Sequence, residues 1–177
     1  MALILGKEYC KVDSNGRFKF PIALKRQLES EDGRFVIRQS IYAECLELWT
    51  YASFREEVEK LQERLNPYRR EDRELLRKLT EGNIIELDSN DRLLVPPEQK
   101  SLIAKSKEVV LQSTGKFIEL WDREAYDRMN QATSDYALRA EALLGPTISR
   151  FLAVNIGCGF CNPYGSKTLS SLTVSNE

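Results

Sequence analysis

A ten-residue pattern occurs twice in this chain of 177 residues, and this repeat constrains the fold more than any other feature. Residues 12–21 (VDSNGRFKFP) match residues 87–96 (LDSNDRLLVP), and residues 46–49 (LELW) match residues 118–121 (IELW). The first pair is offset by 75 residues and the second by 72, so the lengths of the two copies differ by a few residues of loop. Two matches in the same order indicate a duplicated module.

Within the first copy, the side-chain pattern predicts two strands joined by a tight turn. Apolar and polar residues alternate over 9–12 and 18–20, which is the period of a β-strand. The intervening Asp-Ser-Asn-Gly is typical of a hairpin turn, because Gly16 accepts a positive φ. The apolar members are expected to face a core and the basic members to face water: Cys10, Val12, Phe18 and Phe20 against Lys11, Arg17 and Lys19.

Each copy then continues with a short helix, two strands and an amphipathic helix. In the first copy these are expected at 21–28, 35–39, 45–50 and 54–65, followed by a second helix that begins after Asn66-Pro67 and is closed by Gly82. In the second copy we expect strands at 84–87, 93–95, 109–112 and 117–122, a short helix at 96–104 and a helical segment that ends near Leu144. The apolar helix faces exceed what one small module can cover, so we expect them to pack on each other and on neighbouring subunits.

Composition narrows the class of function. The chain contains no histidine, which excludes Ser-His and Cys-His nucleophilic catalysis and removes the commonest zinc ligand. This favours a binding protein, not an enzyme, with no cofactor and no metal. No apolar stretch reaches membrane-spanning length and the apolar start is too short for a signal peptide, so we expect a cytoplasmic protein. Cys10 and Cys45 are interpreted as small buried side chains and not as a disulfide.

Charge is segregated along the chain, although the net charge is only −1. Residues 1–28 carry six basic and two acidic side chains, a net +4, whereas acidic residues gather at 29–32 and 56–81. Such segregation favours a basic face that binds a polyanion, and chance clustering on a solvated surface is the alternative.

The two turns carry the candidate functional residues. Paired Asp13 and Asp88 are compatible with a catalytic carboxylate dyad, but an aspartate at the start of a tight turn more often accepts backbone N–H bonds. We favour Arg17 and Arg92 as ligand-binding groups, because a guanidinium matches a guanine edge or a phosphate. The alternative is that each arginine only pins its own turn by pairing with the local aspartate.

Two lysines lie in the predicted strands that flank the first turn. Lys11 and Lys19 suit phosphate contacts, which supply affinity without sequence reading. Residues 146–177 differ in composition and are expected to be an atypical, disordered tail, and a sequence foreign to the domain is the alternative. Within that tail, the lone C-x-x-C at 158–161 is a weak zinc or redox signal.

The duplicated turn motif, followed in each copy by an (Ile/Leu)-Glu-Leu-Trp strand, resembles the MraZ family of the AbrB/SpoVT superfamily. The resemblance covers residues 6–144. It implies an α+β fold of two tandem swapped-hairpin β-barrel modules with an amphipathic helix after each: a first module at 6–65, a helical linker at 66–82 and a second module at 83–145. It also implies a homo-oligomeric ring that binds double-stranded DNA at promoter direct repeats.

By the same resemblance, the chain is a nucleoid-associated transcriptional regulator, typically a repressor, of the division and cell-wall gene cluster. The residues implied to contact DNA are Ser14, Asn15, Arg17, Ser89, Asn90 and Arg92. Asp91 replaces the family's glycine, and asparagine stands at 15 and 90 where lysine is frequent, so we expect the second loop to contribute less. The alternative is an antitoxin-like or scaffold module whose ligand is another protein.

Overall fold

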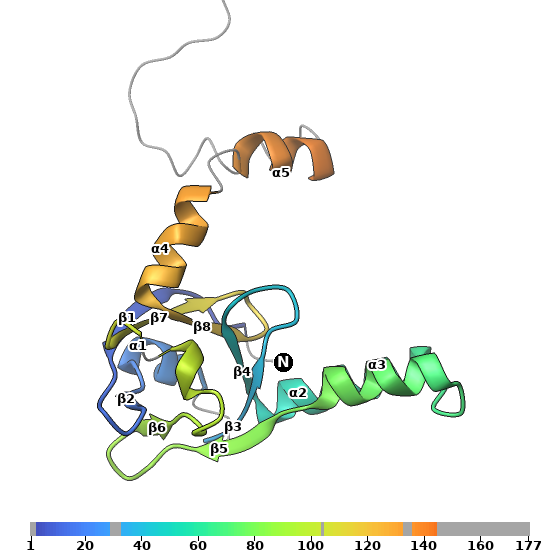
Figure 1. Cartoon of the computed structure of the whole chain (residues 1–177), viewed down its shortest axis with the longest axis horizontal. Helices are drawn as coiled ribbons and strands as arrows, with labels where there is room; N and C mark the ends of the chain where they lie inside the picture. The colour runs from blue at the N-terminus through green and yellow to red at the C-terminus, as the bar shows by residue number, and fades with distance from the viewer. Residues whose placement is uncertain (1–2, 29–32, 104, 133–135, 145–177) are drawn as a thin grey trace, which may run out of the picture. The chain divides into compact units, whose positions relative to one another are not determined.

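The computed structural model describes residues 3–28, 33–103, 105–132 and 136–144. The chain forms two compact units, Met1–Ala132 and Thr133–Glu177. In the second unit the described element is α5 (Tyr136–Leu144). The first unit contains all the strands of the described chain and both copies of the repeated turn (Figure 1).

Both copies contain four strands in the same order followed by a helix, but the short helical segment after the second strand differs between them. The first copy supplies β1 (Lys7–Lys11), β2 (Arg17–Lys19), α1 (Ile22–Lys25), the 3-10 helix η1 (Arg26–Leu28), β3 (Arg34–Gln39), β4 (Leu46–Thr50) and α2 (Tyr51–Arg64). After α3 (Arg70–Thr80), the second copy supplies β5 (Asn83–Glu86), β6 (Arg92–Leu94), the 3-10 helix η2 (Lys100–Leu102), β7 (Glu108–Ser113), β8 (Ile118–Asp122) and α4 (Arg123–Ala132).

Strands of the two copies exchange partners. The six-stranded sheet has the order β1-β7-β8-β4-β3-β5, with every pair antiparallel, and β2 pairs with β6 in a separate two-stranded ribbon. The first strand of each copy therefore lies against the third strand of the other copy. This exchange confirms the predicted α+β fold with swapped hairpins.

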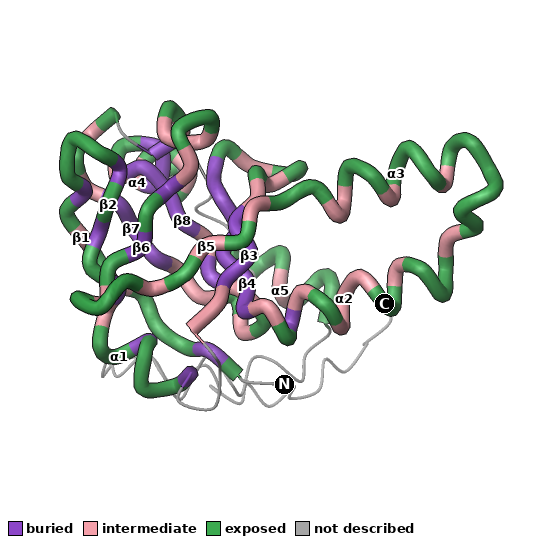
Figure 2. Tube along the Cα trace, turned by 90° about the horizontal axis from the view of Figure 1, so that it is seen from below, coloured by how far each residue is buried: buried purple, intermediate pink, exposed green. Residues whose placement is uncertain are grey.

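One apolar core lies between the sheet and the ribbon (Figure 2). Phe18 and Leu93 point inward from the ribbon and are almost completely buried, as are Ile37, Leu48 and Leu111 from the sheet. Because this core draws side chains from both copies, neither copy encloses its apolar face alone. Burial of this area is the main driving force that holds the exchanged strands together.

The outer face of the sheet carries a smaller buried cluster, which includes Cys45 and Trp121. The repeated Glu-Leu-Trp segments lie at this face and form the same contact in both copies. Glu47 and Glu119 lie opposite each other on β4 and β8, and each accepts a hydrogen bond from the indole N–H two residues later, at 3.1 Å and 2.9 Å. Arg38 forms an ion pair with Glu47 at 2.7 Å. Nearby Cys45 is fully buried, and that burial raises the pKa of its thiol to about 12. Glu47, Trp49 and Trp121 are therefore buried parts of the structure. Cys45 is buried as predicted, whereas Cys10 is only half-buried, and both are free thiols.

The helices depart from the sequence predictions at their ends. Helix α2 begins three residues earlier than expected, because the Thr50 side chain accepts the Ser53 N–H and caps the helix. A short helix was expected at 96–104, but residues 96–99 form one turn and the backbone then tightens into η2, whose hydrogen bonds span three residues instead of four. The helical segment expected to end near Leu144 is described as two helices, α4 and α5.

Helices α2 and α3 keep an apolar stripe that the first unit covers only in part (Figure 2). Phe54, Val58 and Leu61 on α2 are half-buried, and Leu75 on α3 remains 46% exposed. The helices of the described ranges are too short or too polar to cross a membrane. The predicted tail at 146–177 and its C-x-x-C lie outside the described residues.

Candidate nucleic-acid interface

Both repeated turns have the same internal geometry. Asp13 Oδ1 accepts the backbone N–H of Asn15 at 2.9 Å and of Arg17 at 2.8 Å. Asp88 Oδ1 accepts the N–H of the equivalent residues, Asn90 and Arg92, at 2.8 Å each. Each aspartate thus closes an Asx-turn, and the strand that follows sets the direction of its arginine.

These backbone bonds also fix the charge of the turn aspartates. The N–H groups of Arg17 and Arg92 are the largest influence that lowers the pKa of Asp13 and Asp88, respectively, and both guanidinium groups add electrostatic stabilisation. A catalytic dyad needs one carboxyl with a raised pKa. The geometry is therefore that of two ionised turn residues and opposes the dyad interpretation.

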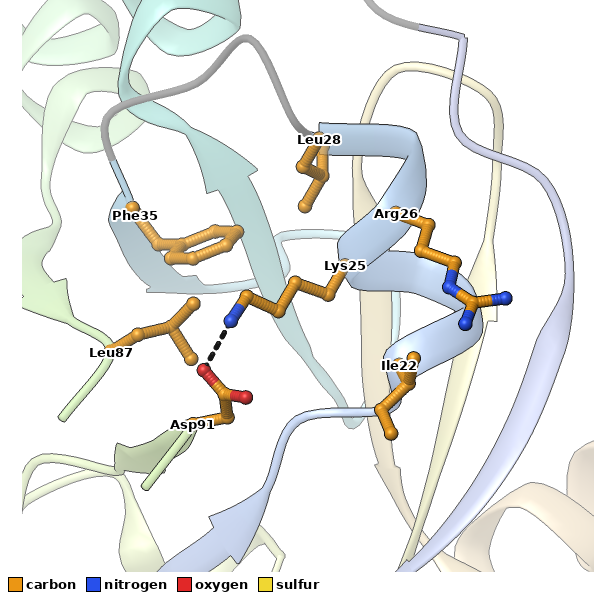
Figure 3. A pocket seen from close by; sticks show the side chains of 8 residues that line it. Ile22, Lys25, Arg26, Leu28, Phe35, Leu87 and Asp91 are labelled. Atoms are coloured by element: carbon orange, nitrogen blue, oxygen red, sulfur yellow. Dashed lines mark hydrogen bonds and ion pairs between the residues drawn. The ribbon is translucent and has the colours of Figure 1, made fainter. Parts of the chain in front are cut away.

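The turn positions expected to need a glycine adopt left-handed backbone in both copies. Gly16 has φ +85° and Asp91 has φ +58°. Aspartate tolerates this region better than most residues because its short side chain forms local hydrogen bonds. Asp91 therefore preserves the turn, and its carboxylate forms an ion pair with Lys25 from α1 (Figure 3).

The fold brings the two turns onto one surface. In the ribbon, Arg17 lies opposite Leu94 and Lys19 lies opposite Arg92. Two backbone bonds join the turns reciprocally: Phe20 donates to the carbonyl of residue 91 at 2.8 Å, and Val95 donates to the carbonyl of residue 16 at 3.0 Å. Because Phe18 and Leu93 point into the core, alternation directs the ribbon's basic side chains outward.

All eight predicted contact residues are exposed: Lys11, Ser14, Asn15, Arg17, Lys19, Ser89, Asn90 and Arg92. Within the described part of the chain, the guanidinium groups of Arg17 and Arg92 form no ion pair or hydrogen bond. Their exposure argues against the alternative in which each arginine is consumed by its own turn. Lys11 lies on β1 opposite Glu108 and lines one pocket with Lys19 of the ribbon.

Two lysines that the sequence analysis did not single out also reach this surface. Lys25 follows Pro21 by four residues and Lys100 follows Pro96 by four, so they are equivalent in the two copies. Each crosses to the turn of the other copy: Lys25 to Asp91 and Lys100 to the carbonyl of Ser14. The matched spacing after proline was a usable signal, but it does not tell which turn each lysine meets.

The described residues hold no group of three or more metal-ligating side chains. The chemistry that the surface offers is therefore that of guanidinium, ammonium, hydroxyl and amide groups on a rigid ribbon. Such groups bind phosphates and the edges of bases.

The exchanged strands and paired turns define an AbrB-like swapped-hairpin protein. Comparison with known proteins gives the family. A family model described as "MraZ protein, putative antitoxin-like" matches residues 79–143. The chain is 34% identical to the Transcriptional regulator MraZ of Flavobacterium psychrophilum over 148 residues, which covers 82% of this chain and 94% of that protein.

Other relatives give the same result. The Transcriptional regulator MraZ of Christiangramia forsetii is 33% identical over 82% of this chain and 95% of its own length. That of Mycoplasmoides gallisepticum is 31% identical over 75% of this chain and 91% of its own length. The chain belongs to the MraZ family. These relatives are named as regulators and not as enzymes.

Proposed function

We propose that this protein is a sequence-specific regulator of transcription that binds double-stranded DNA through the ribbon formed by β2 and β6. One observation carries the proposal: Arg17 and Arg92 are exposed on adjacent strands, and their guanidinium groups form no hydrogen bond or ion pair within the described chain. Membership of a family whose members are named transcriptional regulators supports it.

In this proposal the arginines contact the edges of the bases and the lysines contact the phosphates of the DNA backbone. Arg17 and Arg92 lie on paired strands whose inner residues are fixed by the core, so the backbone from which each guanidinium projects is held in place. A bidentate arginine–guanine contact contributes about 1–3 kcal/mol of discrimination between bases. Lys19, opposite Arg92, and Lys11 neutralise phosphates, and the turn residues Ser14, Asn15, Ser89 and Asn90 supply neutral hydrogen bonds.

Avidity is proposed to come from a ring-like homo-oligomer. One ribbon offers few basic contacts, and several ribbons aligned along one duplex make later contacts effectively intramolecular. The half-exposed apolar stripe of α2 and α3 supports contacts between subunits.

We further propose that the modules span 6–65 and 83–145 with 66–82 as linker. The proposed target is direct repeats in the promoter of the division and cell-wall cluster, bound as a repressor in the cytoplasm at the nucleoid.

The test is binding to the DNA upstream of the protein's own gene, measured by fluorescence anisotropy at several salt concentrations. Arg17→Ala is expected to weaken specific binding by about 1–3 kcal/mol and to relax sequence preference. Arg55→Ala, which changes an exposed arginine on α2 that pairs with Glu59, is the matched control. A fragment with two repeats is expected to bind more tightly than a fragment with one. Equal affinity and preference for the wild type and Arg17→Ala would refute the assignment.

The competing interpretation is an interaction module that binds another protein. It predicts that, at low salt, the protein raises the anisotropy of a labelled duplex no more than a non-binding control protein does. The same titration therefore separates the two functions.

A further inference from the structure

The lysines that follow Pro21 and Pro96 are placed equivalently but differ in the partner that each one meets. At the first turn, Lys100 donates to the backbone carbonyl of Ser14, which is neutral. At the second turn, Lys25 forms an ion pair with the carboxylate of Asp91. An ammonium group has three donors, so Lys100 keeps its full charge and two donors for a further acceptor.

A second lysine stands beside Lys100 at the first turn. Lys107 is exposed, and its backbone carbonyl accepts the N–H of Val12 at 2.9 Å, which fixes it next to the turn. Lys100 and Lys107 share a groove of about 350 Å³ with Val12, Asp13 and Ser14. Both ammonium groups belong to the second copy, whereas the turn that they flank belongs to the first.

The net charge around the two turns differs as a result. The first turn gathers Arg17, Lys100 and Lys107 against Asp13, a net +2. The second gathers Arg92, Lys25 and Arg26 against Asp88 and Asp91, a net +1, and the charge of Lys25 is paired with Asp91.

The ion pair at the second turn is partly open to solvent. The side chains of Lys25 and Asp91 are 45% and 34% exposed, so a phosphate that approached Lys25 would meet the carboxylate beside it (Figure 3). Displacement of Asp91 by a phosphate leaves that carboxylate without its partner next to a polyanion. The ion pair therefore disfavours a contact between the second turn and the DNA phosphate backbone.

We infer that the DNA backbone is held unequally by the two halves of the chain. Lys100 and Lys107 form a phosphate-binding site at the first turn, and Asp91 withholds Lys25 from the equivalent contact at the second. The inference rests on the proposed DNA binding. It adds two contact residues and gives Asp91 the role of an internal competitor for phosphate.

The experiment measures the slope of log affinity against log salt for the promoter duplex. Lys100→Gln keeps a donor for the Ser14 carbonyl but removes the charge, and it is expected to reduce the slope by about 0.9. When salt is raised from 50 to 200 mM, the affinity of the variant should therefore fall by a factor about 3.5-fold smaller than that of the wild type. Lys107→Gln is expected to behave in the same way, whereas Lys100→Arg should keep the wild-type slope.

The second turn supplies the matched controls. Lys25→Gln should leave the slope unchanged, because that charge is already neutralised. Asp91→Asn should steepen the slope by about 0.9, because it releases Lys25 to bind a phosphate. Asparagine tolerates the left-handed backbone at this position, so the turn is retained. The double variant Lys25→Gln/Asp91→Asn should return to the wild-type slope, which identifies Lys25 as the contact released. Circular dichroism of each variant verifies that the fold is retained.

The outcomes separate this inference from the proposed function. If Arg17→Ala reduces binding while Lys100→Gln, Lys107→Gln and Asp91→Asn leave the slope unchanged, the inference is wrong and the DNA-binding function stands. A slope loss in Lys25→Gln equal to that in Lys100→Gln would also overturn it. If the wild type binds no duplex at low salt, the proposed function itself fails.

Discussion

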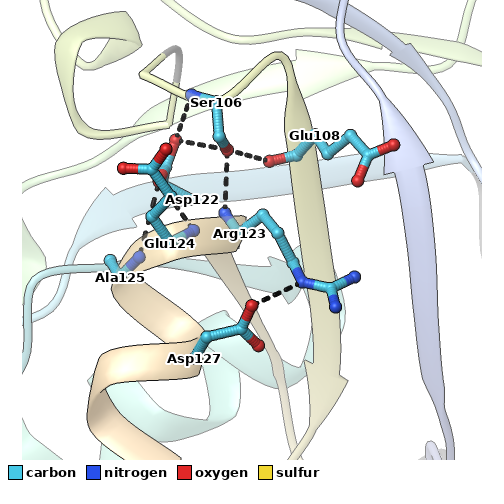
Figure 4. A network of polar contacts seen from close by, with 7 residues as sticks. All are labelled: Ser106, Glu108, Asp122, Arg123, Glu124, Ala125 and Asp127. Carbon is cyan, nitrogen blue, oxygen red and sulfur yellow. Dashed lines mark hydrogen bonds and ion pairs between the residues drawn. The ribbon is translucent and has the colours of Figure 1, made fainter.

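The buried carboxylate at the start of α4 gives a sharp test of how unequal the two copies are. Asp122 is fully buried and accepts hydrogen bonds from the backbone N–H and the hydroxyl of Ser106 at 2.8 Å and 2.9 Å (Figure 4). It also accepts the N–H of Glu124 at 3.1 Å, which caps the helix. The equivalent Thr50 caps α2 through one N–H, that of Ser53, at 3.1 Å. Replacement of each residue by alanine compares the two copies within one molecule.

The expected cost of Asp122→Ala follows from these bonds. Loss of a helix cap costs about 1 kcal/mol. Loss of the charged acceptor of Ser106 adds about 1.5–3 kcal/mol. We therefore expect a total of about 3 kcal/mol for Asp122→Ala and about 1 kcal/mol for Thr50→Ala. For a chain of this length, 3 kcal/mol corresponds to a melting temperature about 6–12 °C lower.

The cost should also depend on pH. Burial raises the pKa of Asp122, but the bonds from Ser106 and from the start of α4 outweigh burial and leave the pKa below its usual range. A carboxyl with a lowered folded-state pKa stabilises the protein above the unfolded pKa of about 3.9 and loses that contribution as pH falls further. The gap between wild type and Asp122→Ala should therefore narrow below about pH 4.

Urea denaturation at fixed protein concentration, at pH 7 and at pH 3, measures both effects. Fixed concentration is needed because self-association alters the apparent stability. If Asp122→Ala costs no more than Thr50→Ala at pH 7, or if the gap is the same at both pH values, the account of this network is wrong.

Three further predictions concern the turn, the core and the linker. Gly82→Ala should destabilise the protein by about 1–3 kcal/mol in urea denaturation, because an added Cβ would lie 2.8 Å from Val36 Cγ1; an unchanged midpoint would contradict this. Cys45 should alkylate at pH 8 more than a hundredfold slower than a free cysteine peptide, because burial raises its pKa to about 12; rapid labelling detected by peptide mass spectrometry would refute this. Asp88→Ala should destabilise at pH 7, and this destabilisation should shrink as pH falls below about 4, because the folded-state pKa of Asp88 is lowered and its stabilisation is lost in acid; a destabilisation as large at pH 3 as at pH 7 in thermal melts would count against the Asx-turn account.

The local elements could be predicted from the sequence because their causes are local. Alternation around the turn predicted β2, and its Asp-Ser-Asn-Gly predicted the turn geometry that Gly16 adopts at φ +85°. The exposure of the predicted contact residues follows from the same alternation, because Phe18 and Leu93 take the inward positions.

Helix ends were predicted less well. The start of α2 depends on the Thr50 cap, and the stripe that begins at Phe54 gave no sign that the helix extends back to Tyr51. The segment after Pro96 has the pattern of a short helix, yet its backbone tightens into the 3-10 helix η2.

The sequence by itself determined the duplication, the two strand–turn–strand units and the identity of the exposed arginines, since periodicity and turn chemistry act over a few residues. Only the tertiary structure decided which strands pair, because β1 gains a partner in β7 by burial of a core that both copies share. It also decided that Lys100 meets Ser14, 86 residues away in the chain, and that Lys25 meets Asp91, 66 residues away. Contacts at such separations leave no local pattern, so the unequal charge of the two turns emerges only when the strands are exchanged.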